Sequence, residues 1–340
     1  MSHAPRRRQA ARLAAVTLSA CSAAVAGCAS PMAELVVRAP NHGLHAHELA
    51  PGAPGPAGSS PWRVLSFPVE APRALVRAYL LDPPAPRAPR GTILVVHGMG
   101  SSARAMSRLG RSLVDAGYRA LLVDLRGHGA STGDRVTFGP GEARDLRAVL
   151  DGVERQGLLA HPLGVYGHSL GGVAGLELAA ADPRVRAVVS VSAFCSLRNL
   201  VRPYLRSYLP EPLANTIQTR RIDEVVDAIG ELVGSDPDRG ALAAVARIEA
   251  PVLFVHGTQD VRVPPSHARS LYTAAAGPSR LQFLDGAGHD VDEVCLSPRA
   301  LNLTVAWFHD RLGDEEPHAV RDVLAERRAP RARVIGLEVP

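Results

Sequence analysis

Five residues near the middle of the chain combine a nucleophile with the glycines that a sharp turn needs: Gly167-His168-Ser169-Leu170-Gly171. An apolar run precedes them at Leu163 to Tyr166, and a helical stretch of small residues follows from Val173 to Ala181. A serine hydroxyl is a weak nucleophile, so a fold that uses one holds it at the tip of a strand-to-helix turn, within reach of a histidine. Glycines on both sides fit that strained backbone. The pattern therefore predicts nucleophilic catalysis by Ser169.

The elements that would position this serine alternate in a regular order from Trp62 onward. Strand-like and helix-like segments in alternation predict a doubly wound α/β sheet with helices on both faces. Ligands bind such sheets at the carboxyl ends of the strands, where reactive groups and glycines gather in this chain. The expected strands are 62–70 and 74–82 (an antiparallel hairpin), 92–96, 119–124, 163–166, 185–191, 252–256 and 281–284, and helices are expected at 103–116 and 141–156.

Two motifs carry a family resemblance. Asp124-Leu125-Arg126-Gly127-His128-Gly129-Ala130-Ser131 and Gly167-His168-Ser169-Leu170-Gly171-Gly172 resemble the α/β-hydrolase superfamily, in the branch of monoglyceride-lipase-like esterases and serine aminopeptidase-like hydrolases. The resemblance covers about Trp62 to Leu312. It implies an α/β-hydrolase fold, with a mostly parallel eight-stranded sheet, helices on both faces and a lid insertion. It leaves the substrate open, because the superfamily hosts esterases, lipases, peptidases, thioesterases and non-catalytic relatives.

The family order of nucleophile, acid and base is matched by Ser169, Asp260 and His289. His289 would accept the proton of the serine hydroxyl and deliver it to the leaving group, while Asp260 would hold the imidazole in the useful tautomer. Asp285 and Asp290 compete for the acid's role, but an acid so close in sequence to His289 rarely reaches the far imidazole nitrogen. The other histidines at strand ends are expected to be positioning or packing residues: His128, His168 and His256.

The tetrahedral intermediate of such an attack carries a negative oxygen that needs hydrogen-bond donors. The expected donors are two backbone amides, those of Leu170 after the nucleophile and Met99 in the loop after the first parallel strand. No cofactor and no metal are expected, since a triad of this kind works without either.

A lid is expected at about 194–248, where the chain has aromatic, proline and helical character. Leucines and tyrosines on its inner side would suit an acyl chain, whereas an acidic patch would suit a free amino terminus. Its arginines favour an esterase over an aminopeptidase, although they could equally form an ordinary solvated face; they are Arg198, Arg202, Arg206, Arg220 and Arg221.

The N-terminus has the layout of an export signal. Residues 1–12 are basic, residues 13–26 are apolar and too short to span a bilayer comfortably, and Val25-Ala26-Gly27-Cys28 resembles the bacterial lipobox. Residues 1–27 are therefore expected to be a signal peptide, and Cys28 to carry a lipid that anchors the protein to the cell envelope. The residue after the cysteine is Ala29 and not the aspartate that resembles an inner-membrane retention signal, which favours the outer membrane if the cell has two membranes. The alternative is an ordinary cleaved signal and a secreted or periplasmic protein.

Residues 28–61 are expected to be a flexible tether, because Pro, Gly, Ala and Ser dominate them. Their three histidines, His42, His45 and His47, are interpreted as solvated rather than metal-binding. Residues 313–340 are expected to be a poorly ordered tail. Once the signal is removed and Cys28 is acylated, Cys195 and Cys295 remain, as either a disulfide or two core thiols.

Composition argues against a nucleic-acid partner. All 38 basic residues are arginine, four of them lie in the first 27 residues, and the remainder of the chain balances 34 basic against 33 acidic side chains. The leading hypothesis is thus an envelope-anchored serine hydrolase acting on small-molecule carboxylic esters. A peptidase or acyltransferase with the same triad, and a catalytically silent surface-binding lipoprotein, are the alternatives; natural substrate and oligomeric state stay open.

Overall fold

The computed structural model describes residues 29–44, 62–70, 72–206 and 219–313, and an eight-stranded sheet forms its frame. The strand order is β1-β2-β4-β3-β5-β6-β7-β8, with the first two pairs antiparallel and the other five parallel. The mostly parallel eight-stranded sheet expected from the sequence is confirmed. The strands are β1 (Arg63–Val69), β2 (Ala74–Leu81), β3 (Thr92–Val96), β4 (Arg119–Val123), β5 (Leu163–His168), β6 (Val185–Val191), β7 (Val252–Gly257) and β8 (Ser279–Leu284).

The central strands are apolar without interruption because both of their faces are covered. All five residues of β3 are buried, and alternate side chains point to opposite faces. Leu94 and Val96 join one hydrophobic core, while Ile93 and Val95 join the other. The sheet therefore separates two hydrophobic cores, and a different set of helices covers each one.

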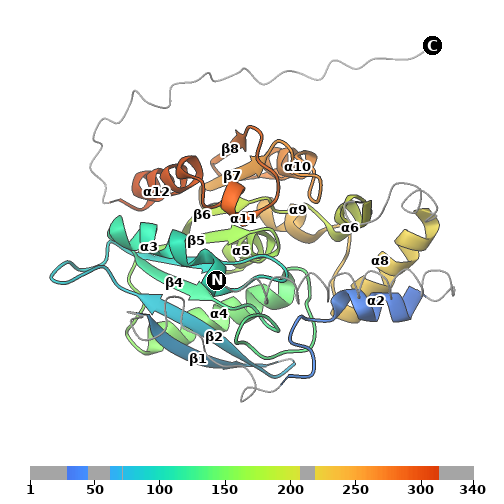
Figure 1. Cartoon of the computed structure of the whole chain (residues 1–340), viewed down its shortest axis with the longest axis horizontal. Helices are drawn as coiled ribbons and strands as arrows, with labels where there is room; N and C mark the ends of the chain where they lie inside the picture. The colour runs from blue at the N-terminus through green and yellow to red at the C-terminus, as the bar shows by residue number, and fades with distance from the viewer. Residues whose placement is uncertain (1–28, 45–61, 71, 207–218, 314–340) are drawn as a thin grey trace, which may run out of the picture.

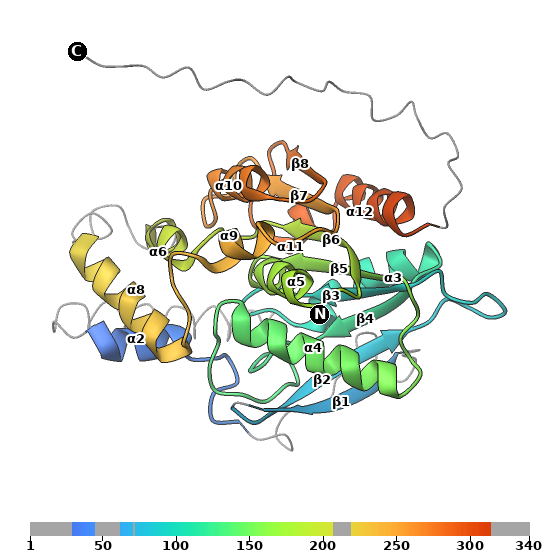
Figure 2. The same ribbon diagram turned by 180° about the vertical axis from the view of Figure 1, so that it is seen from behind.

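Figures 1 and 2 view these two faces in turn. One face carries α4 (Pro140–Arg155), α5 (Leu170–Ala181), α9 (Gly240–Val245) and α10 (Ser266–Ala274). The other carries the 3₁₀ turn η1 (Ala103–Met106), α3 (Ser107–Asp115), α11 (Val291–Val294) and α12 (Pro298–Leu312). Helices on both faces are thus confirmed, and the last described helix ends at Leu312, where the folded part was expected to end.

The segment expected to be a lid divides into two parts. Helices α6 (Leu197–Arg206) and α8 (Thr219–Val233) lie beyond the sheet, at its right-hand end in Figure 1. We call α6 and α8 the cap. Helix α9, in contrast, contacts α5 and α10 and belongs to the layer that covers the sheet. The expected lid range of 194–248 therefore runs too far at its C-terminal side.

One arginine holds the two cap helices together. The Arg198 guanidinium donates to Asp223 (3.2 Å) and Asp227 (2.5 Å) on α8 and to Asp238 (2.6 Å) in the loop that follows. Arg220 and Arg221 both pair with Glu224 on α8 itself. These three arginines are neutralised by neighbouring acids, so the argument that favoured an esterase from a surplus of positive charge in the lid is not supported by their geometry.

The flexible tether expected for residues 28–61 is wrong for its first part. Helix α2 (Ala29–Val37) packs against α8, and its Ala33 and Val37 are fully buried. The physical reason is a helical spacing of apolar residues, Ala29, Met32, Ala33, Val36 and Val37, which forms one continuous face. Pro and Gly abound only after residue 50, and the rest of the expected tether, 45–61, lies outside the described residues.

Several expectations fall on residues that the structure does not describe. These are the signal peptide at 1–27, the lipidation of Cys28, the histidines His45 and His47, and the tail from residue 314 onward. In the described ranges, no helix is long and apolar enough to cross a membrane.

A buried ion pair ties the loop after β4 to α4. Arg126 donates from Nε and Nη2 to both carboxylate oxygens of Asp145, at 2.7 and 2.6 Å, and both side chains are almost fully buried. Removal of one partner leaves an uncompensated buried charge. We expect Asp145→Ala to lower the free energy of unfolding by about 3–5 kcal/mol, measured by urea denaturation.

The matched control is Asp151→Ala on the same helix, where a half-exposed carboxylate pairs with Arg184. A loss below about 1 kcal/mol is expected there, because exposed ion pairs contribute little. Equal losses in the two variants would contradict the importance of the buried pair.

Candidate active site

The turn that carries Ser169 has the sharp geometry expected from its glycines. Strand β5 ends at His168, α5 begins at Leu170, and Ser169 between them has φ 53° and ψ −116°. A Cβ at Gly167 would lie 2.1 Å from the carbonyl oxygen of Gly171, and one at Gly171 would lie 2.5 Å from a backbone oxygen of the neighbouring strand's end. Only glycine fits at either position, and the serine is held in a left-handed conformation that costs energy.

Three residues far apart in the sequence meet at this turn. The Oγ of Ser169 lies 3.1 Å from Nε2 of His289, and Nδ1 of His289 lies 2.6 Å from Oδ2 of Asp260. Both contacts are satisfied when His289 carries its proton on Nδ1, so that Nδ1–H donates to the carboxylate and Nε2 accepts from the hydroxyl. This is the arrangement in which an imidazole removes a proton from a serine.

Asp260 is buried and yet held as a carboxylate. Burial alone would raise its pKa, but hydrogen bonding to His256 and His289 outweighs burial and holds the pKa well below its usual range. Its second oxygen accepts from the backbone N–H groups of Val263 (2.8 Å) and Arg262 (3.1 Å). The acid therefore stays ionised and fixed in orientation, which is what the imidazole needs from it.

The two aspartates that flank His289 in sequence, Asp285 and Asp290, are not the partners of its Nδ1. Asp290 accepts from the Arg262 guanidinium at 3.0 Å, on the surface, and the partner of the His289 Nδ1 is Asp260. The structure thus brings together the three residues that the sequence singled out, and the two competing acids, Asp285 and Asp290, are not at the imidazole.

His168, next to the nucleophile, binds the backbone of His289. Its Nε2–H donates to the backbone carbonyl of His289 at 3.1 Å, and the two rings lie 5.0 Å apart. Burial, together with the nearby His289, lowers the pKa of His168 to about 3, so this ring stays neutral. Its contact with the base agrees with the positioning role expected for it.

His256 does the same for the acid. Its fully buried ring donates from Nε2 to the carbonyl of Val263 at 2.7 Å and lies 3.4 Å from Oδ2 of Asp260. Val263 is therefore held by two hydrogen bonds within the loop 256–263: its carbonyl accepts from His256, and its N–H donates to Asp260. The sequence predicted a positioning or packing role for His256 but not its contact with Asp260; its position four residues before Asp260, at a strand end, was the available signal.

The loop expected to supply one oxyanion donor lies against the nucleophile. A Cβ on Gly98 would come within 3.2 Å of the Cβ of Ser169, so the backbone that leads to Met99 runs directly past the serine. Leu170 is the first residue of α5, where backbone N–H groups have no partner within the helix. The assignment of Met99 and Leu170 as oxyanion donors stays a prediction, and their placement is compatible with it.

Buried polar groups hold this loop in place. The His97 ring donates from Nδ1 to the Gly98 carbonyl (2.7 Å) and accepts from the Leu125 N–H (3.0 Å) at Nε2. Its ring centroid is 5.3 Å from that of His128, and burial lowers the pKa of both imidazoles to about 4. Asp124 links the segments that follow β3 and β4, because its carboxylate accepts from the N–H of Ala103 (2.7 Å), at the start of η1, and from the N–H of Ala130 (2.8 Å). Sequence reasoning noted Asp124 at a strand end but gave it no role.

The two remaining cysteines are free and buried, so the disulfide alternative is excluded. Cys195 belongs to the core on one side of the sheet and Cys295 to the core on the other. Burial raises the pKa of the Cys295 thiol to about 12 and also raises that of Cys195, which makes both unreactive. No group of three or more metal-ligating side chains is found within the part of the chain that the structure describes.

A small cavity lies where the cap meets the body of the molecule. Its apolar lining comes from Phe138 before α4, Phe194 and Leu197 at the start of the cap, and Val233 at the end of α8. Gly139, next to Phe138, lies against Val173, in the first turn after the nucleophile: a Cβ on Gly139 would be 2.9 Å from the Val173 side chain. The loop before α4 therefore packs against α5, the helix that follows Ser169.

Known proteins are similar to parts of this chain. The family model described as serine aminopeptidase, S33, matches residues 87–229. The uncharacterized protein YqkD of Bacillus subtilis is 26% identical over 234 residues, which is 68% of this chain and 74% of YqkD. Esterase YjfP of Escherichia coli is 25% identical over 235 residues, covering 66% of this chain and 90% of the esterase.

Solved structures show the same architecture. The esterase Pf2001 of Pyrococcus furiosus superimposes with a TM-score of 0.59 at 19% identity, covering 74% of this chain and 93% of the esterase. Est1E of Butyrivibrio proteoclasticus, solved with ferulic acid bound, superimposes with a TM-score of 0.54 at 18% identity. At identities this low, the likeness shows only that this chain and the two esterases share a fold.

The hydrogen bond between Asp260 and His289 provides a test of the site. Asn at position 260 is expected to hold the imidazole in the wrong tautomer and lower kcat by about 10⁴-fold, as loss of the acid does in other triads. The measurement is hydrolysis of an activated ester by Asp260→Asn. Asp290→Asn, on the same side of the site, should keep its activity, and a comparable loss in Asp290→Asn would contradict the assignment of the acid.

Proposed function

We propose that this chain, which has the α/β-hydrolase fold, is a serine hydrolase that cleaves carboxylic esters through an acyl-serine intermediate. The observation that carries the proposal is the continuous hydrogen-bonded chain from the Ser169 hydroxyl through His289 to an ionised Asp260. Relatives and structural neighbours that are named as esterases support hydrolysis in general.

The chemistry follows from the positions of these groups. Nε2 of His289 accepts the proton of the Ser169 hydroxyl while Oγ attacks the ester carbonyl carbon, and the new positive charge on the imidazole is stabilised by Asp260. The resulting oxyanion would be bound by the N–H groups of Met99 and Leu170, a contribution of about 10²-fold or more per donor. His289 then protonates the leaving alkoxide, and a water repeats the sequence to release the acid.

The preference for esters rests on the relatives and structural neighbours that are named as esterases. A peptidase is the second candidate, because the matching family model is described as a serine aminopeptidase. An acyltransferase would share the acyl-serine and differ only in the acceptor.

We further propose that the protein is exported and anchored to the cell envelope through lipid on Cys28. The support is the sequence pattern alone: a basic segment, a short apolar run and a lipobox-like Val25-Ala26-Gly27-Cys28. The substrate would then be an ester that is available outside the cytoplasm. An ordinary cleaved signal would give the same enzyme in soluble form.

A fluorophosphonate probe is expected to label the wild type on Ser169 and to leave Ser169→Ala unlabelled, because the probe reacts only with an activated serine. Hydrolysis of p-nitrophenyl esters should disappear in the same variant. Aminoacyl anilides assayed in parallel separate an esterase from a peptidase, which would cleave the anilides at a comparable rate. A folded wild type that the probe does not label would show a binding protein rather than an enzyme.

Lipidation is tested by expressing the full chain in a bacterium that processes lipoproteins. We expect the wild type in the membrane fraction, with the mass of a diacylglycerol-modified chain that begins at Cys28. Cys28→Ser should be found in the soluble fraction or retain its signal. Wild type that is soluble and unmodified would favour the ordinary signal peptide.

A further inference from the structure

Met99, one of the two expected oxyanion donors, lies in a loop that contains two glycines. The loop comprises residues 97–102, between β3 and η1, and its Gly98 and Gly100 flank Met99. Glycine loses more conformational freedom than any other residue when it is fixed in one conformation, and Gly100 is fixed in a left-handed one (φ 69°). A donor that stabilises an oxyanion must be in place before the reaction starts. Contacts with the rest of the chain are therefore needed to hold the Met99 N–H.

The start of this loop is held by the nucleophile turn and by one hydrogen bond. A Cβ on Gly171 would lie 2.5 Å from the carbonyl oxygen of His97, and a Cβ on Gly98 would lie 3.2 Å from the Cβ of Ser169. The His97 ring accepts from the N–H of Leu125 at 3.0 Å. Packing and this bond fix the first two residues of the loop, before Met99.

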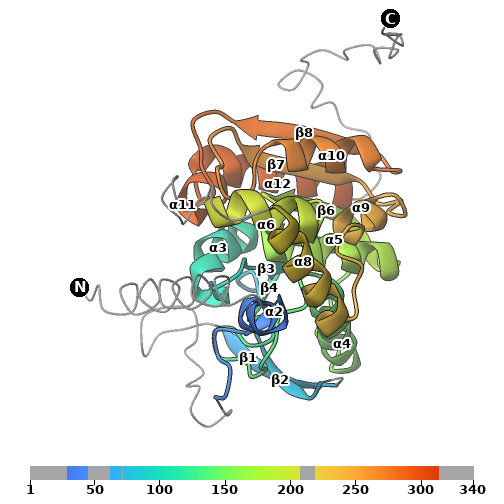
Figure 3. The same ribbon diagram turned by 90° about the vertical axis from the view of Figure 1, so that its right-hand side faces the viewer.

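The end of the loop is bound by the carboxylate of Asp124. Its Oδ1 accepts from the N–H of Ala103 at 2.7 Å, and Ala103 is the buried first residue of η1. Asp124 directly follows β4, the strand that pairs with β3, so the bond joins two neighbouring strand ends. Figure 3, which views the molecule from the right-hand side of Figure 1, shows β3 and β4 side by side with α3 next to them.

The Asp124 carboxylate is itself held in place. Its Oδ2 accepts from the N–H of Ala130 (2.8 Å) and from the hydroxyl of Tyr79 on β2 (3.0 Å). A Cβ on Gly129 would lie 2.2 Å from the carboxyl carbon, so the loop after β4 closes tightly over the group. Burial raises the pKa of Asp124, and a buried carboxylate is costly. This costly group lies where the loops after β3 and β4 meet.

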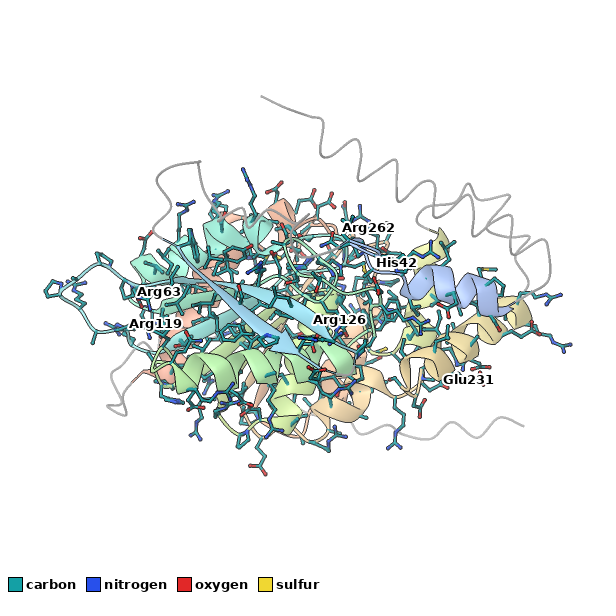
Figure 4. The ribbon with its side chains drawn as sticks, turned by 90° about the horizontal axis from the view of Figure 1, so that it is seen from below. His42, Arg63, Arg119, Arg126, Glu231 and Arg262 are labelled. Atoms are coloured by element: carbon teal, nitrogen blue, oxygen red, sulfur yellow. The ribbon has the colours of Figure 1, made fainter. Side chains whose placement is uncertain are left out.

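These contacts lie at the edge of the sheet that carries the triad. In Figure 4, Arg126 and Arg262 both lie to the right of Arg119, the first residue of β4. Arg126 comes two residues after Asp124, and Arg262 comes two residues after Asp260. The carboxylate that binds the loop and the carboxylate of the triad therefore follow parallel strands at the same edge of the sheet.

We propose that Asp124 is a positioning residue for the oxyanion: by binding the Ala103 N–H, it fixes the loop 97–102 and holds the Met99 N–H where the oxyanion forms. This inference rests on the proposed serine hydrolase function. Asp124 acts through the loop, since its side-chain partners are Tyr79, Ala103 and Ala130. The oxyanion develops only after the ester has bound, so loosening the loop slows the chemical step and leaves ester binding nearly unchanged.

The first test is Asp124→Asn, which replaces one acceptor oxygen by an NH₂ group. The amide oxygen is expected on the side of Ala130 and Tyr79, where there are two donors, and the NH₂ group then faces the Ala103 N–H. Two donors cannot bond to each other, so the bond to the loop is lost. For p-nitrophenyl acetate, kcat is expected to fall about 10–100-fold, up to the loss seen when one oxyanion donor is removed, while KM stays within about twofold.

The matched control is Asp145→Asn. Asp145 is also a buried carboxylate, but it binds the Arg126 guanidinium from α4 and not the loop 97–102. This variant is expected to lose stability and to keep kcat within about twofold of the wild type, at a temperature where circular dichroism shows both variants folded. An equal fall of kcat in the two variants, or an unchanged kcat in folded Asp124→Asn, would overturn the proposal.

A second variant removes the same hydrogen bond from its other side. Ala103→Pro deletes the N–H at the first position of η1, where proline is tolerated, and Ser102 before it already has the extended backbone that proline requires (φ −160°, ψ 167°). We expect a similar fall of kcat, and little further loss when Ala103→Pro is combined with Asp124→Asn. An unchanged kcat in folded Ala103→Pro would contradict the proposal even where Asp124→Asn does not fold.

A trifluoromethyl ketone probes the oxyanion directly. The Oγ of Ser169 adds to the ketone carbon, the hydroxyl proton passes to His289, and the former carbonyl oxygen keeps the negative charge where the oxyanion of the reaction would be. Its affinity is expected to fall in Asp124→Asn by about the same factor as kcat and to stay within about twofold of the wild type in Asp145→Asn. A lower kcat with unchanged affinity for the ketone would overturn the proposal.

Hydrogen exchange gives a readout that needs no ester. Amides of residues 97–102 are expected to exchange faster in Asp124→Asn and Ala103→Pro than in the wild type and Asp145→Asn. Equal exchange in all four proteins would show that Asp124 does not fix the loop. If the wild type cleaves no ester and binds no ketone, the proposed function fails, while the exchange measurement still decides whether Asp124 holds the loop.

Discussion

The hydrogen bond from His289 to Asp260 is the interaction on which the site depends. A carboxylate taken out of water is costly, and an isolated one would take up a proton rather than stay charged. Here two backbone N–H groups bind one oxygen of Asp260, and the other oxygen faces His289 and His256. The surrounding loop therefore has to be rigid, since each donor must stay in place for the carboxylate to remain ionised.

This requirement explains why so many histidines follow strands without taking part in the chemistry. The rings of His97, His168 and His256 each donate to a backbone carbonyl of a loop that would otherwise be free to move: Gly98, His289 and Val263 respectively. Burial lowers the pKa of His97 and His168 to about 4 and about 3, so both are neutral donors at neutral pH. An imidazole reaches further than a serine or an asparagine, which lets His97 and His168 bond to loops that follow other strands.

Much of this could be predicted from sequence, because the signals were local. Thr92–Val96 and Val185–Val191 have the bounds expected for them, since short runs rich in β-branched residues between turn residues leave few alternatives. The meeting of Ser169, Asp260 and His289 followed from parallel strands, which place the residues after each strand at one edge. Contacts between distant surfaces could not be predicted in this way. The sequence does not show that Arg198 pairs with two acids of α8 and with Asp238 in the loop that follows, because these residues lie 25 to 40 positions away. It also does not show that α9 packs on α5 rather than belonging to the lid.

Helix α2 was missed for a different reason, and that reason bears on how the cap is held. Composition averaged over residues 28–61 is dominated by the Pro and Gly after residue 50, and it hides the helical spacing of Ala29, Met32, Ala33, Val36 and Val37. A nine-residue helix is not stable alone in water, so α2 exists because α8 covers its apolar face, and α8 gains the same cover in return. Neither helix packs on the sheet as α5 does, and their mutual burial replaces that support. The first turn of α2 directly follows Cys28, so any attachment at that residue would bear on the helix that holds the cap.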